Sequence, residues 1–199
     1  MRIAVFSDIH GNFDALKRVM SLAEKERADK IVFLGDIFQR KNQEVECLGY
    51  LKNSGVICVK GNCELYLDCG VQIDRDVENL RGYYDNMREK LTAEQRLFIH
   101  NLPLFYEIAE NGRRIMFSHF LFKDKTAEYP YFQLSEMETG GFLSAVNSEE
   151  IRGYDLVAVG HAHKKFVVEN VVGVSAAGIG EPSVLMIEID EKVSFRYVK

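Results

Sequence analysis

Seven side chains that can bind a cation follow five short apolar segments of the chain. They are two aspartates, one asparagine and four histidines, at Asp8, His10, Asp36, Asn62, His119, His161 and His163. Carboxylate oxygens, amide oxygens and imidazoles all bind divalent metals, and seven of them are too many for one tetrahedral site. The set suits two ions that share a bridging carboxylate, an arrangement that activates water for hydrolysis.

Each of these residues also has an ordinary structural role to consider. An aspartate after a strand, such as Asp8 or Asp36, often caps a helix, and a single His161 or His163 is more often a hydrogen-bonded turn residue than a ligand. Independent capping roles do not explain why all seven follow apolar segments, so we favour the metal hypothesis. The fifth histidine, His100, lies near a predicted helix end and is assigned to the surface.

The segments that must position these side chains are short and continuously apolar, which is typical of strands buried on both faces. Strands are predicted at residues 2–8, 30–36, 55–62, 113–119 and 155–161. Helical spacing of apolar residues at 13–28 and 42–55 completes a βαβαβ half with parallel strands. Ligands at the carboxyl ends of such strands face one crevice.

The second half of the chain combines helices with hairpins. Residues 76–101 are predicted to form two helices, the second beginning at Thr92 in a capping-box pattern and ending before Pro103. An Asn-Gly turn signal at 111–112 predicts a hairpin, and a second hairpin is expected around residues 190–191.

Chain length favours one domain over residues 1–199. Within it, the segment 120–147 is aromatic and polar without a clean period, so a lid over the site and an irregular excursion are both open. Its Tyr129, Tyr131 and Phe132 also allow a homo-oligomer interface.

The charge balance and the chain start limit the range of partners. With a net charge of −5 and a pI of about 5.6, no stable nucleic-acid complex and no membrane binding are expected. The apolar run that opens the chain is too short for a signal peptide, so we expect a cytoplasmic protein. The four cysteines lack paired Cys-x-x-Cys spacing and are expected to be free thiols.

The ordered motifs resemble the calcineurin-like metallophosphoesterases. They are Asp8-x-His10, Gly35-Asp36, Gly61-Asn62, His119 and Gly160-His161-x-His163. The stretches "HGN", "GNCE" and "LTAEQRLFIHNLP" look like the small bacterial and archaeal phosphodiesterase branch, and the resemblance covers residues 1 to about 180. It implies an α/β fold, a four-layer α/β/β/α sandwich of two mixed β-sheets.

The resemblance also implies how the metals are held. One ion is assigned to Asp8, His10, Asp36 and His163, and the other to Asp36, Asn62, His119 and His161, with Asp36 as the bridge. Manganese is expected, with iron, zinc, nickel or cobalt as alternatives.

The implied activity is hydrolysis of phosphodiesters or small nucleotide-like phosphate esters by a metal-bridging hydroxide. A phosphomonoesterase of the same fold and a weakly active binding or scaffold module are the competing hypotheses. Because no ligand position is vacant, the scaffold hypothesis is disfavoured.

Two further residues are candidates for contact with the substrate. Family phosphatases often carry a histidine after the ligand asparagine, where it can protonate the leaving group; here the residue is Cys63, whose ordinary thiol pKa makes it a poorer acid. Cys63 either assists the leaving group or fills space while water supplies the proton. Asn12 either binds a phosphate oxygen or caps the helix that begins near Phe13.

Overall fold

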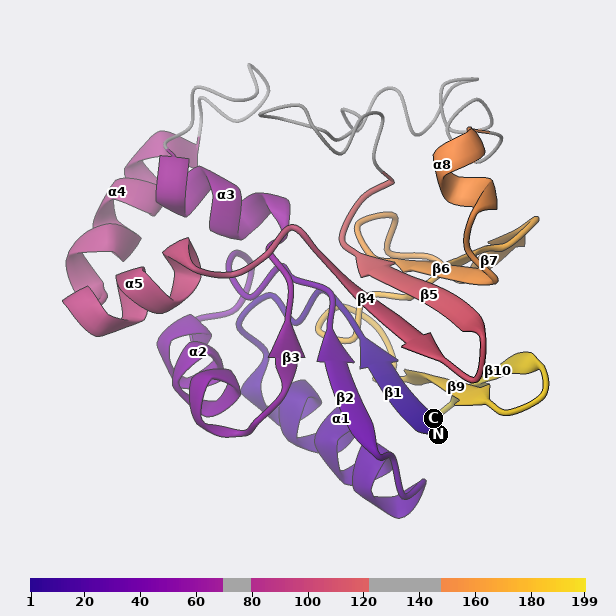
Figure 1. Ribbon diagram of the computed structural model, residues 1–199. Helices are drawn as coiled ribbons and strands as arrows, with labels where there is room; N and C mark the ends of the chain where they lie inside the picture. Colours follow the sequence, from indigo (N-terminus) through magenta and orange to yellow (C-terminus); the bar gives the residue numbers. More distant parts are fainter. Residues whose placement is uncertain (70–79, 122–147) are drawn as a thin grey trace.

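The computed structural model describes residues 1–69, 80–121 and 148–199 of the chain, which form two five-stranded sheets (Figure 1). The first sheet contains β1 (Arg2–Phe6), β2 (Lys30–Phe33), β3 (Ile57–Cys58), β9 (Val184–Ile189) and β10 (Val193–Val198). The second contains β4 (Phe105–Glu110), β5 (Arg113–Ser118), β6 (Leu156–Val159), β7 (Phe166–Val168) and β8 (Val171–Gly173).

Both sheets mix parallel and antiparallel pairs. The strand orders are β10-β9-β1-β2-β3 and β4-β5-β6-β8-β7. The β1, β2 and β3 strands run parallel in the first sheet, as do β5, β6 and β8 in the second. The remaining pairs are antiparallel, which confirms the prediction of mixed sheets.

The helices form the outer layers. They are α1 (Phe13–Lys25), α2 (Glu44–Asn53), α3 (Asn62–Cys69), α4 (Arg81–Lys90), α5 (Ala93–His100) and α8 (Glu149–Arg152). The α1 and α2 helices cover one face of the first sheet, while α8 lies on the outer side of the second (Figure 1). Helices, sheet, sheet and helix make the four-layer α/β/β/α sandwich that the resemblance of the motifs implies.

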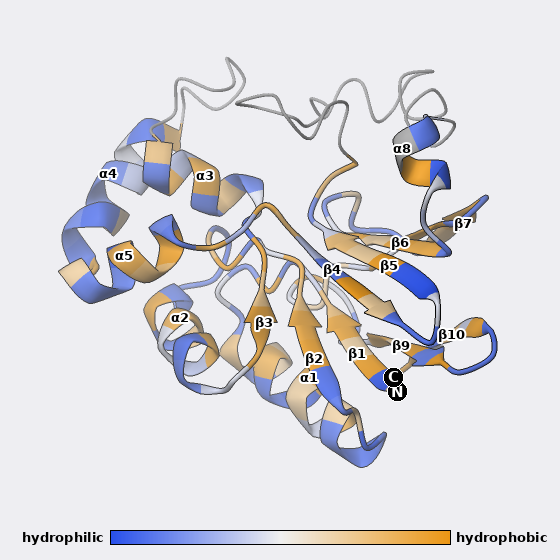
Figure 2. Ribbon diagram, viewed as in Figure 1, coloured by the Kyte–Doolittle hydropathy of each residue, from blue (hydrophilic) through white to orange (hydrophobic). Residues whose placement is uncertain are grey.

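Alternation along β1 explains how one strand serves two cores. Ala4 and Phe6 pack among the helices, whereas Ile3 and Val5 face the second sheet, and all four are fully buried. Successive side chains of a strand point to opposite faces, so both faces need apolar residues. Figure 2 shows the resulting apolar strands β1 to β3. An uninterrupted run of apolar residues, as in β1, is therefore the pattern expected of a strand between two layers of this sandwich.

The third strand is the main correction to the predicted elements. The sequence predicts a strand over 55–62, but β3 contains only Ile57–Cys58. The chain turns at Gly61 and begins α3 directly at Asn62, a helix that the apolar pattern does not predict. Its residues 63–67 are all buried, so no amphipathic period marks it.

The predicted helix start and hairpins are confirmed. The Thr92 hydroxyl accepts a bond from the Gln95 N–H at 3.2 Å, and the Gln95 side chain accepts one from the Thr92 N–H at 2.9 Å, completing the capping box of α5. Asn111 and Gly112 both have positive φ in the turn between β4 and β5. The last hairpin joins β9 to β10.

Several predictions concern parts of the chain outside the described residues. Nearly all of segment 120–147, with its lid, excursion and interface hypotheses, falls there, so these and the single-domain expectation stay predictions. None of the helices in the described part of the chain has the length and apolarity that a bilayer crossing requires. Cys47, Cys58 and Cys63 are free and buried, as expected for thiols.

Candidate metal centre

The seven predicted ligands lie just beyond the carboxyl ends of parallel strands from both sheets. Asp8 and His10 follow β1, Asp36 follows β2, Asn62 follows β3, His119 follows β5, and His161 and His163 follow β6. Since the parallel strands of both sheets end on the same side of the sandwich, their loops meet there. The structure brings all seven side chains together.

One group of close atoms comes from the loops after β1 and β6. The His163 Nε2 atom lies 3.1 Å from Asp8 Oδ1 and 3.3 Å from His10 Nε2. The His10 Nε2 atom is in turn 3.7 Å from Asp8 Oδ1. These three residues can hold one cation.

A second group comes from the loops after β2, β3, β5 and β6. The Asn62 Oδ1 atom lies 3.0 Å from His161 Nδ1 and 3.1 Å from His119 Nε2. The His119 Nε2 atom is also 3.5 Å from Asp36 Oδ1. Asp8, Asp36 and His119 offer ligand atoms within 4.8 Å of one another, which joins the two groups into one site.

Hydrogen bonds to backbone carbonyls fix two of the imidazoles. His10 Nδ1 lies 2.7 Å from the Phe38 carbonyl, and His119 Nδ1 lies 2.8 Å from the Leu34 carbonyl. A carbonyl oxygen only accepts, so each Nδ1 donates, and in the neutral imidazole that binds a metal the lone pair is then on Nε2. Metal-binding histidines are held in this way. The His119 lone pair then faces the Asn62 oxygen, and two acceptors at such a distance repel unless a cation lies between them.

Three buried polar side-chain atoms have no hydrogen-bond partner within the described residues. They are Ser7 Oγ, Asp8 Oδ1 and His161 Nε2, and the last two belong to predicted ligands; Asp8 Oδ1 lies 3.1 Å from His163 Nε2 without a hydrogen bond of good geometry. Leaving a buried polar atom unsatisfied costs about 1–3 kcal/mol, so a fold normally avoids it. Bound divalent cations would satisfy the two ligand atoms, and the mixed carboxylate, amide and imidazole set fits them.

The electrostatics of the site favour a cation. Burial and the neighbouring Asp8 raise the pKa of Asp36 to about 6. Burial, helped by His119, lowers the pKa of His161 to about 3. Burial acts to raise the pKa of Asp8, but the contact with His163 and the nearby imidazoles outweigh that effect and lower it. At neutral pH the carboxylates are ionised and His161 is neutral, which are the metal-binding forms.

The backbone at these ligands is unusual. Positive φ occurs at five of the seven residues, namely Asp8, His10, Asp36, His161 and His163. For residues other than glycine this conformation is uncommon and costs energy, and it tends to persist at functional sites. Bonds from the Asp8 N–H to the Gly35 carbonyl and from the His10 N–H to the Asp36 carbonyl, both 3.0 Å, hold two of the loops together. The side chains are therefore positioned by the fold.

Cys63 lies beneath the ligands rather than at an open surface. It is fully buried in the apolar cluster of the helical layer, and its backbone N–H donates to Asp36 Oδ1 at 2.9 Å. Burial, followed by the charge of Asp36, raises the pKa of its thiol well above the usual range. Such a thiol is a weak acid, which supports the space-filling hypothesis; the catalytic role stays a prediction.

Asn12 is engaged in the fold through both polar atoms of its side chain. Its Oδ1 accepts from the Ala15 N–H at 3.1 Å and caps α1, while its Nδ2 donates to the Gly178 carbonyl at 3.0 Å. The capping hypothesis therefore describes its geometry. Binding of a phosphate oxygen by Asn12 stays a prediction and would require one of these bonds to be exchanged.

Sequence reasoning assigns no role to two residues that the structure places at the site. Glu64 is fully buried and accepts backbone hydrogen bonds from two different turns. Phe120 packs against His119 and His161, with ring centroids 4.6 and 4.7 Å apart, and covers one side of both imidazoles. The signal for Glu64 is its position three residues after Gly61, the spacing of a capping box, which only a predicted helix would have revealed.

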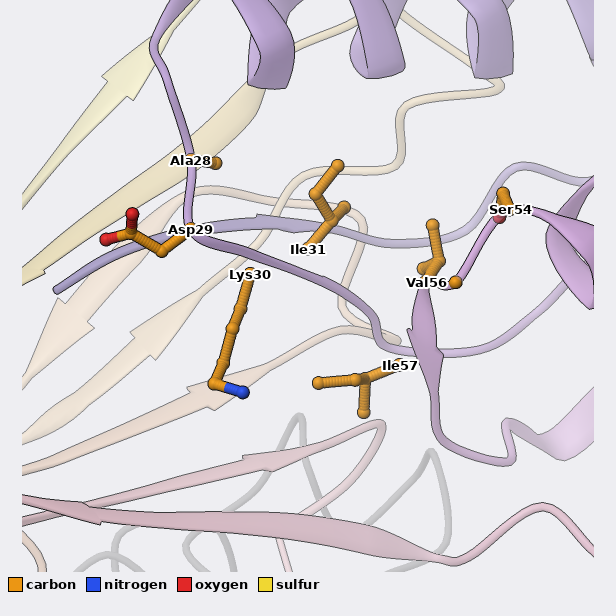
Figure 3. A pocket seen from close by; sticks show the side chains of 8 residues that line it. Ala28, Asp29, Lys30, Ile31, Ser54, Val56 and Ile57 are labelled. Carbon is orange, nitrogen blue, oxygen red and sulfur yellow. The ribbon is translucent and has the colours of Figure 1, made fainter.

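A depression of about 450 Å³ lies at the opposite end of the first sheet, near the amino ends of β2 and β3 (Figure 3). It is lined by residues 28–31 and 54–57. The one carboxylate there, Asp29, is exposed and accepts a bond from the Arg2 N–H at 2.7 Å. Nothing in this lining gathers potential metal ligands as the other end of the sheet does.

Known proteins are similar to this chain in sequence or in fold. An uncharacterised protein of Methanocaldococcus jannaschii is 28% identical over 170 residues, which cover 83% of this chain and 63% of the relative. A symmetrical bis(5'-nucleosyl)-tetraphosphatase of Actinobacillus succinogenes is 31% identical over 116 residues, 53% of this chain and 42% of the relative. The chain thus spans less than two thirds of the length of these curated relatives.

A solved structure supports the fold. The crystal structure of a metallophosphoesterase from Sphaerobacter thermophilus matches with a TM-score of 0.65 and 22% identity, covering all (100%) of this chain and 88% of that one. The family model described as calcineurin-like phosphoesterase matches residues 1–165, which include all seven predicted ligands. The chain therefore belongs to the calcineurin-like phosphoesterase family, as its motifs predict.

Proposed function

We propose that the protein is a dimetal phosphoesterase that hydrolyses phosphodiesters or small nucleotide-like phosphate esters. Membership of the family supports phosphoester hydrolysis in general. The observation that carries the proposal is the convergence of buried acceptor atoms from both sheets, with Asp8 Oδ1 and His161 Nε2 lacking partners among the described residues. Two divalent cations would satisfy such a cluster of acceptors.

The proposed ligand sets follow the two groups of close atoms. Asp8, His10, Asp36 and His163 hold one ion, and Asp36, Asn62, His119 and His161 hold the other. When bound, the ions supply an activated water nucleophile and stabilise negative charge on the phosphoryl oxygens. Manganese is the proposed metal, although the donor set also suits iron, zinc, nickel or cobalt.

The protein's own residues prepare the site for an anionic substrate. Asp8 and Asp36 remove only part of the charge of two divalent ions, because the histidines and Asn62 are neutral ligands. The site therefore stays locally positive in a chain whose net charge is −5. That local charge attracts a phosphate ester, and Phe120 beside the imidazoles limits the approach of water on one side.

A second candidate substrate is a dinucleoside polyphosphate. The relative from Actinobacillus, named for cleavage of this class, is 31% identical over 116 residues of this chain. Its substrate contains phosphoanhydride bonds, whose leaving groups are better than alkoxides and need less help from an acid such as Cys63. Phosphomonoester hydrolysis and weak activity in a binding module are competing hypotheses, and a comparison of substrates distinguishes them.

A metal-dependence assay tests the proposal. Metal-stripped protein is compared with manganese-loaded protein on bis(nitrophenyl) phosphate, nitrophenyl phosphate and diadenosine tetraphosphate. We expect turnover only after loading, with the monoester cleaved more slowly than the diester. Absence of metal-dependent turnover on all three substrates would reject the enzymatic function, and faster turnover of the monoester would favour a phosphomonoesterase.

A further inference from the structure

We propose that Glu64 is a positioning residue that holds the two ligand-bearing turns, at Asp36 and at Asn62, in register for metal binding. The inference rests on the proposed metal site and adds a residue to which neither the motifs nor the family match assigns a role. It is argued from hydrogen bonds, burial and the close contact of the two turns.

The Glu64 carboxylate joins two segments that are far apart in sequence. Its Oε2 atom accepts from the N–H groups of Asp36 and Gly61, each at 2.8 Å. Its Oε1 atom accepts from the Ile37 N–H at 2.7 Å. The side chain is fully buried, so each of these bonds forms out of contact with water. One carboxylate thus fixes the turn after β2 against the turn after β3.

The attachment is reciprocal. Asp36 Oδ1 accepts from the Cys63 N–H at 2.9 Å, so the turn after β2 also caps the first turn of α3. The two turns additionally touch through glycines. A Cβ atom on Gly61 would lie 2.3 Å from Asp36 Oδ1, and one on Gly35 would lie 2.4 Å from the Gly61 nitrogen. Side chains at either position would push the turns apart.

Ordinary helix capping accounts for only one of the three bonds to Glu64. A glutamate at the third position of a helix commonly accepts from the N-cap N–H, and this explains the bond to Gly61. The bonds from Asp36 and Ile37 come from residues 28 and 27 positions earlier. Burying a carboxylate is costly unless its oxygens are satisfied, and here the donors come mainly from the ligand-bearing turn.

The placement predicts an unequal effect on the two ions. The ion assigned to Asp36, Asn62, His119 and His161 takes two of its ligands from the turns that Glu64 joins. The ion assigned to Asp8, His10, Asp36 and His163 takes one. Loss of the Glu64 bonds should therefore lower the binding affinity of the first ion more than that of the second.

Manganese titration of Glu64 variants tests the inference. In E64Q the amide oxygen replaces one carboxylate oxygen, while its NH₂ group meets an N–H donor; E64A removes all three bonds. Binding is followed by calorimetry and by the spin-coupled signal of paired manganese ions. We expect wild type to bind two ions. E64Q should bind the ion assigned to Asp36, Asn62, His119 and His161 about 10–100-fold less tightly, with loss of the coupled signal, and E64A should bind it more weakly still.

Gln95→Ala is the matched control. Gln95 occupies the same position in α5 and makes the same local bond to its N-cap N–H, at 2.9 Å, without any bond to a ligand-bearing turn. We expect Q95A to lower the melting temperature but to bind two manganese ions as wild type does. E64Q is the decisive variant if E64A does not fold.

The outcomes separate the inference from the proposed function. Wild type that binds no manganese would overturn the metal site and the role of Glu64 together. If wild type and E64Q both bind two ions with the same affinities, the role of Glu64 alone would be overturned. Equal weakening of both ions in E64Q would assign Glu64 a general structural role and would also overturn the inference.

Discussion

The two ends of the first sheet differ in what they bury. At the carboxyl ends of β1, β2 and β3, buried carboxylates, imidazoles and an amide converge, and two of their atoms have no partner among the described residues. At the amino ends, a depression of about 450 Å³ is lined by turn residues, and its carboxylate is exposed. A depression in the surface therefore does not by itself indicate the proposed metal site. Buried acceptor atoms without hydrogen-bond donors do indicate it.

The two ends also differ in backbone energy. Left-handed conformations at Asp8, His10, Asp36, His161 and His163 each cost roughly 1–3 kcal/mol, and the fold retains them only because the surrounding strands and loop hydrogen bonds hold them. At the amino end, Gly55 in the lining of the depression adopts a left-handed conformation without this cost, while Arg27, next to the lining, is a residue other than glycine with positive φ. Left-handed residues other than glycine are thus more numerous among the proposed ligands than beside the depression.

The largest contrast is expected from matched carboxylate substitutions at the two ends. Asp36→Asn keeps an oxygen for the Cys63 N–H but removes the proposed bridging charge, so hydrolysis should fall by about 10³-fold or more. Asp29→Asn at the amino end should change it less than about twofold. Turnover of bis(nitrophenyl) phosphate and metal content by atomic emission measure both. Comparable losses in the two variants would remove the distinction between the ends.

Metal removal should change stability through the carboxyl end alone. Manganese at 100 times its dissociation constant stabilises the folded state by about 2.7 kcal/mol, which corresponds to roughly 5–10 °C in melting temperature for a chain of this size. Calorimetric scans with manganese and with chelator should show this shift in wild type and Asp29→Asn. Asp36→Asn should show little of it, and a full shift in that variant would place the metal elsewhere.

Acid should weaken metal binding at the carboxyl end. Burial raises the pKa of Asp36 to about 6, so below that pH a cation must displace a proton from it. Affinity for manganese should therefore be level above pH 7 and fall about tenfold per pH unit below 6. Titration calorimetry in two buffers of different ionisation enthalpy counts the released proton. Constant affinity between pH 7 and pH 5 would contradict the assignment of Asp36.

The smallest effect on activity is expected from Cys63→Ala. The thiol is fully buried between the apolar cluster of the helical layer and the side chains of His10 and Asp36, so its removal should lower the free energy of unfolding by about 1–2 kcal/mol while changing turnover only a few-fold. Alkyl and aryl phosphodiesters should be affected equally. Cys63→His is the companion variant, and a selective loss on alkyl esters in Cys63→Ala would instead support a role as general acid.

The sequence was sufficient to predict that the seven proposed ligands lie together, because each follows a buried strand, as His119 follows β5 and His161 follows β6. It was insufficient for Glu64, because the predicted third strand ran through Gly61 to Asn62. The α3 helix begins there and is buried around most of its circumference, so it has no polar face to produce a helical period. The cross-turn bonds of Glu64 join positions 27 and 28 residues apart, which only the tertiary structure reveals.

The positive φ values were also beyond prediction. Aspartate and histidine adopt positive φ more often than most residues other than glycine, but residue type alone does not indicate that Asp8, Asp36 and His161 are the ones that do. These conformations arise because loops from two sheets must meet within a few ångströms. The residue types of the site are local information, whereas its strain is a property of the assembled sandwich.

Anomalous diffraction from crystals grown with manganese is the most direct test of the central claim. The account predicts two manganese peaks at the carboxyl ends of the parallel strands, each within coordinating distance of its assigned side chains and with Asp36 touching both. Peaks absent from this position, with the seven side chains pointing away from one another, would contradict it.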